Sequence, residues 1–405
     1  MKGHIRERSP GRWAIILDVQ DTTGKRKRKW HSFKGTKREA QIECARLISE
    51  MNSGEYVETS KLTIEQWIDQ WIKAGAPGRK KKKVGQRTLE RYEELLNVHV
   101  KPKLGLRPLQ KLQATEIDRL YNELEGKIAP MTAHHVHVVF NSCLSTAERK
   151  GLLKANPMRR VEQLPSPGES DHGLALDETD LATLVTGFKP SPMMYVPVAV
   201  DAATGARRNE LLAFRWTDHN PEKKTLTVER ALEVTKKFGV RYKPPKTARG
   251  LRTIALDDAT NAMLLKEKEK HLRIRAGIPD GVDVDLSLVR LPDDALIFPA
   301  APGRAEDFTF TKPRDPGNFS KEFTRRAKRL DFADFRFHHF RGTHATLLLD
   351  RGVPVHVVAE RIGDDPAVLL RNYAKRKRQR GDKPTMDASV SDAISALAAG
   401  FLGPK

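Results

Sequence analysis

The sequence predicts a multidomain protein that is mainly α-helical with small β elements. Its 405 residues are enough for two or three domains with full cores. Apolar residues recur at helical spacing through most of the chain, whereas short β-rich runs occur near its start and in its second half. We therefore expect a small α+β unit, a helical domain and a larger α+β domain, at residues 1–58, 62–161 and 174–405.

The first unit carries the signals of a β-hairpin followed by a helix. Residues 13–19 and 27–33 are rich in residues that favour strands, and turn-forming residues separate them. Thr36 and Glu39 form a capping-box pattern, which predicts that a helix begins just after Thr36. This unit therefore combines two strands with one helix.

The second domain is predicted to contain only helices. Trp67, Ile68, Trp71 and Ile72 form one apolar helical face. Further helices are expected at residues 88–98, 115–124 and 131–150. The last of these contains His134, His135 and His137, which make no i, i+4 pair and have no acidic partner, so we expect no metal site and no cofactor.

A Pro, Ser and Gly-rich stretch at residues 164–173 is typical of a linker. In the third domain, Asp177 is placed to cap a helix. The remaining expected elements are a helix at 193–204, strands at 225–234 and 251–256, a helix at 259–276, irregular chain at 277–316 and a last apolar helix at 389–402.

The composition favours a polyanionic partner. The chain has a formal net charge of +21 and a pI of about 9.9. An anionic membrane is the competing partner, but no amphipathic helix combines a basic face with an aromatic apolar face. No apolar run approaches the roughly 18 residues of a membrane span, and the start of the chain lacks a secretory signal.

Cys44 and Cys143 fall in different domains, so we expect no disulfide and a reducing cytoplasm.

Two basic clusters are candidate DNA contacts. Clusters of this kind are usually solvated surface, but next to DNA they contact phosphates without reading the sequence. One lies in the expected hairpin, and the other follows Pro77 and Gly78: Lys25, Arg26, Lys27 and Arg28; then Arg79, Lys80, Lys81, Lys82 and Lys83.

The part of the chain that leads to Tyr373 contains three helix signals in succession. Apolar spacing predicts a helix at residues 340–350. Pro354 suits the start of a second helix that ends at Gly363, and Pro366 opens a third with Tyr373 on its last turn. Three helices can fold back, so we expect Tyr373 to meet the start of the first one.

Three motifs in this order resemble those of the tyrosine recombinase, or phage integrase, family. His338-x-x-Arg341, followed by Tyr373 within RNYAK, resembles the second box of that family. The segment TGARRNE, which ends at Glu210, resembles the first box. Between the two boxes, Lys246 in the Pro-flanked turn Pro245-Lys246-Thr247 resembles the family's lysine on a β-hairpin. The resemblance extends more generally to a basic N-terminal module and a helical core-binding domain.

This resemblance implies a phosphodiester chemistry. Two guanidiniums suit a pentacoordinate phosphorus because they are planar, permanently charged and bidentate, which points to Arg207 and Arg341. Either arginine can instead form a plain salt bridge, and Glu210 is placed to pair with Arg207 and orient it.

Tyr373 is the expected attacking group and would form a 3′-phosphotyrosyl link to DNA, which conserves the bond energy without ATP or a metal. His338 is the candidate acid/base for the tyrosine proton. Lys246 is the residue that the family would use to protonate the leaving 5′ oxygen, with Lys237 and Lys243 as nearby alternatives. Each of these residues also has an ordinary structural interpretation.

Asp364 departs from the pattern. The family usually has histidine or tryptophan about nine residues before the tyrosine, so either Asp364 replaces that residue or one residue has been lost here. An ionised carboxylate donates no hydrogen bond and repels phosphate. Three functions therefore stay open. The first is a site-specific recombinase that integrates or excises a mobile element. The second is a relative that binds recombination sites without efficient cleavage, and the third is a type IB-like topoisomerase. The family further implies double-stranded DNA, a homotetramer and an accessory directionality factor as partners.

Overall fold

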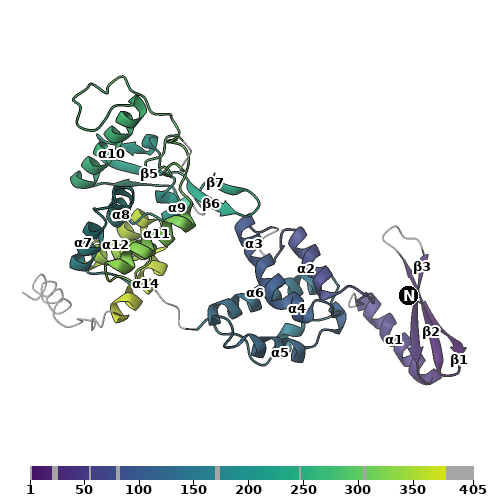
Figure 1. Cartoon of the computed structure of the whole chain (residues 1–405). Helices are drawn as coiled ribbons and strands as arrows, with labels where there is room; N and C mark the ends of the chain where they lie inside the picture. Colours follow the sequence, from purple (N-terminus) through teal and green to yellow (C-terminus); the bar gives the residue numbers. More distant parts are fainter. Residues whose placement is uncertain are drawn as a thin grey trace, which may run out of the picture. The chain divides into compact units, whose positions relative to one another are not determined.

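The computed structural model describes residues 2–20, 26–53, 56–78, 83–168, 174–245, 248–303 and 307–379. The chain forms two compact units, Met1–Ser170 and Asp171–Lys405, and the boundary between them falls within the predicted linker. Figure 1 shows both units. None of the described helices has the length and apolar character that crossing a membrane requires.

The N-terminal part is a three-stranded antiparallel sheet with one helix packed on it. The sheet has the order β1-β2-β3 and the helix follows it: β1 (Lys2–Ser9), β2 (Arg12–Gln20), β3 (Arg26–Lys34) and α1 (Lys37–Ser53). Thr36 and Glu39 form the expected reciprocal cap, with the Glu39 amide 3.3 Å from the Thr36 hydroxyl. The sequence prediction missed β1, because its residues are mostly polar and its main apolar side chain is Ile5. The expected turn at residues 21–24 lies outside the described residues.

The second part of this unit is a helical bundle, as expected. Its helices are α2 (Ile64–Lys73), α3 (Gln86–Leu95), α4 (Lys101–Leu104), α5 (Ala114–Leu124) and α6 (Pro130–Arg149). A π-helical turn, Leu96–Val100, joins α3 to α4, so the helix expected at 88–98 continues further. Trp67, Trp71 and Phe140 are buried in the core, and Trp71 stacks on Tyr92.

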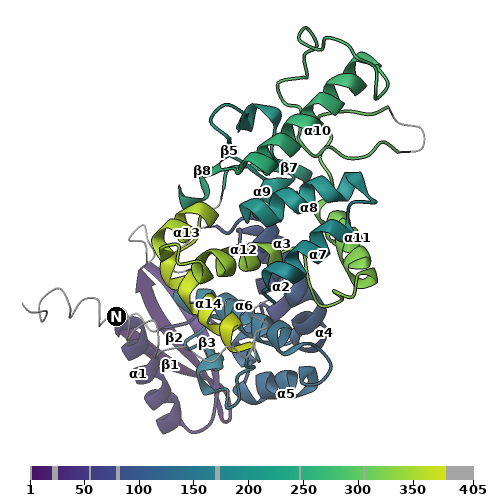
Figure 2. The same ribbon diagram turned by 90° about the vertical axis from the view of Figure 1, so that its left-hand side faces the viewer.

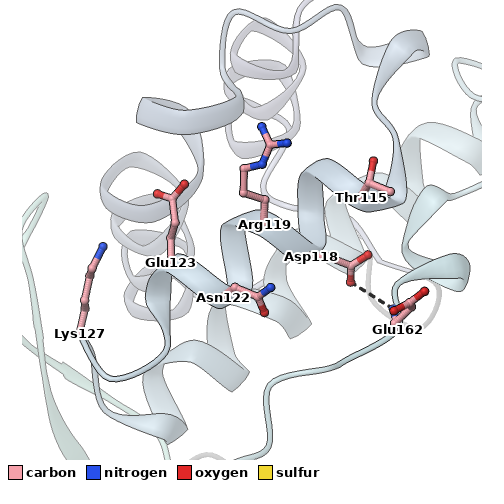
Figure 3. Close-up of a pocket in the computed structure, with 7 residues that line it drawn as sticks. All are labelled: Thr115, Asp118, Arg119, Asn122, Glu123, Lys127 and Glu162. Atoms are coloured by element: carbon pink, nitrogen blue, oxygen red, sulfur yellow. Dashed lines mark hydrogen bonds between the residues drawn. The ribbon is translucent and has the colours of Figure 1, made fainter.

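The histidines of α6 make structural hydrogen bonds. His137 Nδ1 is 3.0 Å from the Tyr121 hydroxyl, and His134 Nδ1 is 2.9 Å from the carbonyl oxygen of Pro165. Figure 3 shows an open depression along α5 on the same domain, where Asp118 accepts a hydrogen bond from the Glu162 amide. The depression is lined by both acidic and basic side chains, so it presents no field of one sign.

The second unit combines a helical cluster with two small sheets. Its first elements are α7 (Glu178–Gly187), α8 (Pro192–Thr204), α9 (Arg208–Leu211), β4 (His219–Asn220), β5 (Thr225–Val228), β6 (Ala231–Thr235), β7 (Gly239–Lys243) and β8 (Arg252–Ala255). One sheet has the order β4-β5-β8, and β6 and β7 form a separate hairpin. The single strand expected at 225–234 is therefore wrong. The chain leaves the first sheet at Arg230, whose guanidinium binds Asp218, and then enters the hairpin.

The remaining helices are α10 (Asp258–Ala276), α11 (Pro316–Arg329), α12 (His339–Asp350), α13 (Val355–Ile362) and α14 (Pro366–Gln379). The prediction missed α11, although Asp315 caps it and Phe319 and Phe323 lie buried one turn apart. It also placed Tyr373 on the last turn of its helix, whereas α14 continues for six residues beyond it to Gln379. The apolar helix expected at 389–402 lies outside the described residues.

Aromatic rings fill the core that holds the last helices in place. Phe323 contacts Phe188, Phe335, Phe337 and Phe340 with ring centroids 5.3–6.4 Å apart. Helix α12 packs against α8 and is itself covered by α13 and α14. Figures 1 and 2 both show α10 at one end of this unit and α14 at the other. This packing fixes the start of α12 beside the end of α8.

Candidate active site

A tight turn after α8 presents the first arginine. Gly205 ends the helix with φ 61°, and its amide donates to the carbonyl of Asp201. A Cβ at Gly205 would lie 2.8 Å from the His344 ring, so both the backbone angle and the space require glycine. The chain then turns into α9, with Arg207 at the N-cap position.

Arg207 binds two carboxylates and a backbone carbonyl. Its Nη1 donates to Glu210 Oε1 at 2.8 Å. Its Nη2 donates to Asp364 Oδ1 at 2.8 Å and to the Gly363 carbonyl at 2.9 Å. The salt-bridge alternative for Arg207 is therefore present in this structure, and it leaves the guanidinium more than one-third exposed.

Arg341, on the first turn of α12, reaches the same carboxylate from the other side. Its Nη1 donates to the Gly205 carbonyl at 3.1 Å. Its Nη2 lies 2.8 Å from Asp364 Oδ2, as an ion pair without the alignment of a hydrogen bond. Asp364 thus joins two guanidiniums that lie far apart in the sequence.

A second layer of charge lies behind this pair. Glu210 is buried and also accepts from Arg252 Nη2 at 2.9 Å. Burial alone would raise the pKa of Glu210, but Arg252 and Arg207 outweigh it and lower that pKa. Arg252 itself is fixed by the carbonyls of Arg361 and Gly250. Glu210 therefore stays ionised and orients Arg207.

Asp201 behaves in the opposite way. It is buried in α8 close to Arg341, and its Oδ1 has no hydrogen-bond partner. Burial raises its pKa well above the ordinary value, although Arg341 opposes this. Burial therefore favours the protonated form of Asp201, which weakens its competition for the arginines.

His344 and Arg361 complete the cluster. His344 Nδ1 donates to the Ala202 carbonyl, and Nε2 accepts from Arg361 Nε at 3.0 Å. Burial, followed by the charge of Arg361, lowers the pKa of His344 to about 4, so the ring is neutral. The sequence prediction missed Arg252, Asp201, His344 and Arg361. Of these four residues, only His344 could have been found from the sequence, because it follows Arg341 by about one helical turn on the same face of the predicted helix.

His338 is at the N-cap of α12 and is exposed to solvent. It lies one turn before Arg341, so both side chains share one face of the helix. The neighbouring His339 accepts a hydrogen bond from the Arg336 amide and packs on Phe335, which is a structural role.

Tyr373 does not meet the arginines in this structure, contrary to the expectation from three returning helices. Its hydroxyl donates to Asp350 Oδ1 at 2.8 Å. Asp350 is the last residue of α12, about 13 Å along the helix axis from Arg341 and on the opposite side of the helix. The packing of α14 against α12 holds the phenol at this far end.

Several of the predicted residues fall outside the described chain. Among them are Lys246, Lys25 and residues 79–82, and the side chain of Arg26 is likewise undescribed. Of the two alternative lysines, Lys243 binds Glu233 at 2.8 Å and Lys237 lies over the Phe238 ring. In the two basic clusters, Arg28 lies 3.4 Å from Asp18, whereas Lys27 and Lys83 are exposed.

The described arrangement can hold an oxyanion between two fixed guanidiniums. The cations Arg207, Arg252 and Arg341 outnumber the two carboxylates that pair with them, Glu210 and Asp364. Such an excess suits a group that gains negative charge as it reacts. Together, the described residues supply charge stabilisation but not yet an attacking group.

Three protein-family models match this chain. Residues 193–380 match the phage integrase family, residues 64–164 match the phage integrase central domain, and residues 5–51 match an arm DNA-binding domain. An integrase of Streptomyces ambofaciens is 26% identical over 387 residues, which covers 91% of this chain and 90% of that protein. A XerC-like tyrosine recombinase of Caldanaerobacter subterraneus is 25% identical, covering 87% and 89%.

Solved structures share the fold. The Tn1549 transposon integrase in complex with transposon right end DNA has a TM-score of 0.62 at 16% identity, covering 84% of this chain and 100% of that chain. A lambda integrase tetramer bound to a Holliday junction has a TM-score of 0.54 at 17% identity, covering 89% and 95%.

Proposed function

Because this chain belongs to the phage integrase family of tyrosine recombinases, we propose that its arginine cluster binds the phosphodiester at which DNA is cut and rejoined. The enzyme is a site-specific recombinase, and integration or excision of a mobile element fits its relatives. The observation that carries the proposal is the convergence of Arg207 and Arg341 on one carboxylate, because a phosphodiester presents its charge in the same way.

In this mechanism the two guanidiniums bind the non-bridging oxygens and stabilise the charge that develops on them. Tyr373 attacks the phosphorus and forms a 3′-phosphotyrosyl bond, while the 5′ oxygen leaves. His338 takes part in transfer of the tyrosine proton, since it shares a helix face with Arg341. Lys246 protonates the leaving oxygen. The attack of the freed 5′ hydroxyl on the phosphotyrosine then rejoins the strand.

The mechanism requires α14 to change position. Tyr373 is bound to Asp350, so the phenol must leave this partner before it reaches a phosphate held by Arg207 and Arg341. We propose that DNA binding drives this change. The attacking tyrosine comes either from the same protomer or from a neighbouring one.

We propose double-stranded DNA as the substrate and a homotetramer as the active assembly. The support comes from relatives: a solved lambda integrase is a tetramer on a Holliday junction, and the Tn1549 integrase was solved with DNA. The net charge of +21 agrees with a DNA partner. We further propose the domain division at residues 1–58, 62–161 and 174–405, phosphate contacts by the two basic clusters, an accessory directionality factor and a cytoplasmic location.

Covalent capture tests this function. A duplex is selected from a random pool by the wild-type chain, nicked near the cleavage position and analysed on denaturing gels. The wild-type chain should form a covalent adduct, and Tyr373→Phe should form none while it binds the intact duplex with unchanged affinity. Tyr195→Phe is the matched control, because Tyr195 packs in the core of the same unit. An adduct that persists in Tyr373→Phe rules out this nucleophile.

A further inference from the structure

The carboxylate of Asp364 has the geometry of a bound phosphodiester. Each of its oxygens lies 2.8 Å from one guanidinium, Oδ1 from Arg207 and Oδ2 from Arg341. A phosphodiester likewise shares a single negative charge between two oxygens. We propose that Asp364 is an internal anion that closes the phosphate site in the DNA-free protein and that the scissile phosphodiester must displace it. This inference rests on the proposed role of the two arginines.

The free protein needs an anion at this place. Only 7% of the Arg341 side chain is exposed, and a buried guanidinium without a counter-charge is strongly unfavourable. Burial and the nearby Arg207 lower the pKa of Arg341, whereas Asp364 raises it. Of the two other acids in the described cluster, Glu210 is bound to Arg207 and Arg252, and burial raises the pKa of Asp201, which disfavours its charged form. Asp364 therefore supplies the counter-charge.

Asp364 is also placed to leave. Its side chain is 32% exposed and lines a surface pocket that Arg249 and Arg361 also line. It lies after α13 has ended, because Gly363 closes that helix with φ 68°. Rotation of the Asp364 side chain towards the pocket would therefore withdraw its carboxylate from both guanidiniums without unwinding α13.

A phosphate cannot simply join the carboxylate. Two anions between the same two guanidiniums would repel each other at close range. Displacement removes this repulsion and leaves Arg207 and Arg341 to the phosphate. Since displacement opposes binding of the phosphate alone, contacts elsewhere on the duplex must supply part of the driving force. Asp364 thus makes engagement of the phosphate depend on a fully bound duplex.

A small diester probe tests this directly. Dimethyl phosphate is titrated into the full-length chain and followed by calorimetry and by arginine side-chain NMR signals. Asp364→Asn keeps the shape of the side chain and removes its charge, so it should bind dimethyl phosphate about ten-fold more tightly than wild type. Asp365→Asn should bind like wild type, because Asp365 pairs with the exposed Arg249 at 2.5 Å and not with the cluster. Adding Arg207→Ala to Asp364→Asn should abolish the gain.

Asp364→Ala is a second variant and should show the same increase in affinity for dimethyl phosphate. The test therefore still works if the Asn variant fails to fold. Unchanged or weaker binding in the folded Asn or Ala variant overturns the inference, because the carboxylate would then only orient the arginines. The covalent-capture assay decides the proposed function separately. A wild-type chain that never forms an adduct refutes that function whatever the diester titration shows.

Discussion

Removal of the charge on Glu210 should lower the free energy of unfolding, because Glu210 holds Arg252 and Arg207 in the arginine cluster. Glu210 and Arg252 have only 3% and 4% of their side chains exposed, and they lie 2.9 Å apart. Breaking a buried ion pair from one side costs roughly 3–5 kcal/mol. The Glu210→Gln side chain keeps one acceptor oxygen, Arg252 keeps two backbone carbonyls, and Arg207 is partly solvated. We therefore expect a loss of about 2–3 kcal/mol.

For a unit of this size, such a loss lowers the melting temperature by about 4–12 °C. Glu233→Gln is the matched control, because Glu233 also binds two cations, Arg241 and Lys243, but these are about 40% exposed. Its loss should stay within about 1 kcal/mol. Urea unfolding, followed by tryptophan fluorescence and far-UV circular dichroism, measures both variants. Equal stability of the two variants would refute the argument that burial makes the Glu210 pair important.

Three other predictions concern neighbouring residues. Asp350→Ala removes the hydrogen-bond partner of Tyr373 and should speed covalent capture about five-fold, since such a bond contributes about 1 kcal/mol; an unchanged rate on the same nicked duplex contradicts this. Asp201→Asn should raise the melting temperature at neutral pH. Above the ordinary pKa of an aspartate, the unfolded chain ionises Asp201 while the folded chain keeps its proton, so the wild type loses stability as the pH rises through this range. In acid both states are protonated, and the stability gained by Asp201→Asn should vanish. Asp364→His should raise the cleavage rate, because histidine donates a hydrogen bond where the carboxylate repels phosphate; a slower variant would show that the carboxylate has a positive role.

The sequence was sufficient to predict the residues with local signals. The capping box at Thr36, the helix that begins near His338 and the helix that ends at Thr204 all follow from backbone chemistry that depends on a few neighbouring residues. The family motifs also identified Arg207 and Arg341, which the structure brings together on Asp364. The family motifs, and not local rules, therefore located the two arginines that meet at Asp364.

The missing parts depend on contacts between distant segments. Arg252 looks like an ordinary strand residue, and its importance appears only when Glu210 and the Arg361 carbonyl pack around it. The charge state of Asp201 depends on burial that no local pattern reports. The position of Tyr373 was missed because it depends on how α14 packs against α12 and on which end of α12 the phenol contacts.

The attachment of α13 to the rest of the unit limits how Tyr373, the proposed nucleophile, can move. Arg361 binds the carbonyls of Ala203 and Ala255, and the Arg361 carbonyl is itself bound by Arg252. These ties anchor α13, so the pivot of any swing lies at the start of α14, beyond Asp364. Tyr373 stands seven residues past Pro366, a lever arm of about 10 Å. Because this arm is short and its pivot is fixed, Tyr373 can reach only a phosphate that is already bound close by. The proposed mechanism therefore requires the arginines to bind the phosphate before Tyr373 attacks it.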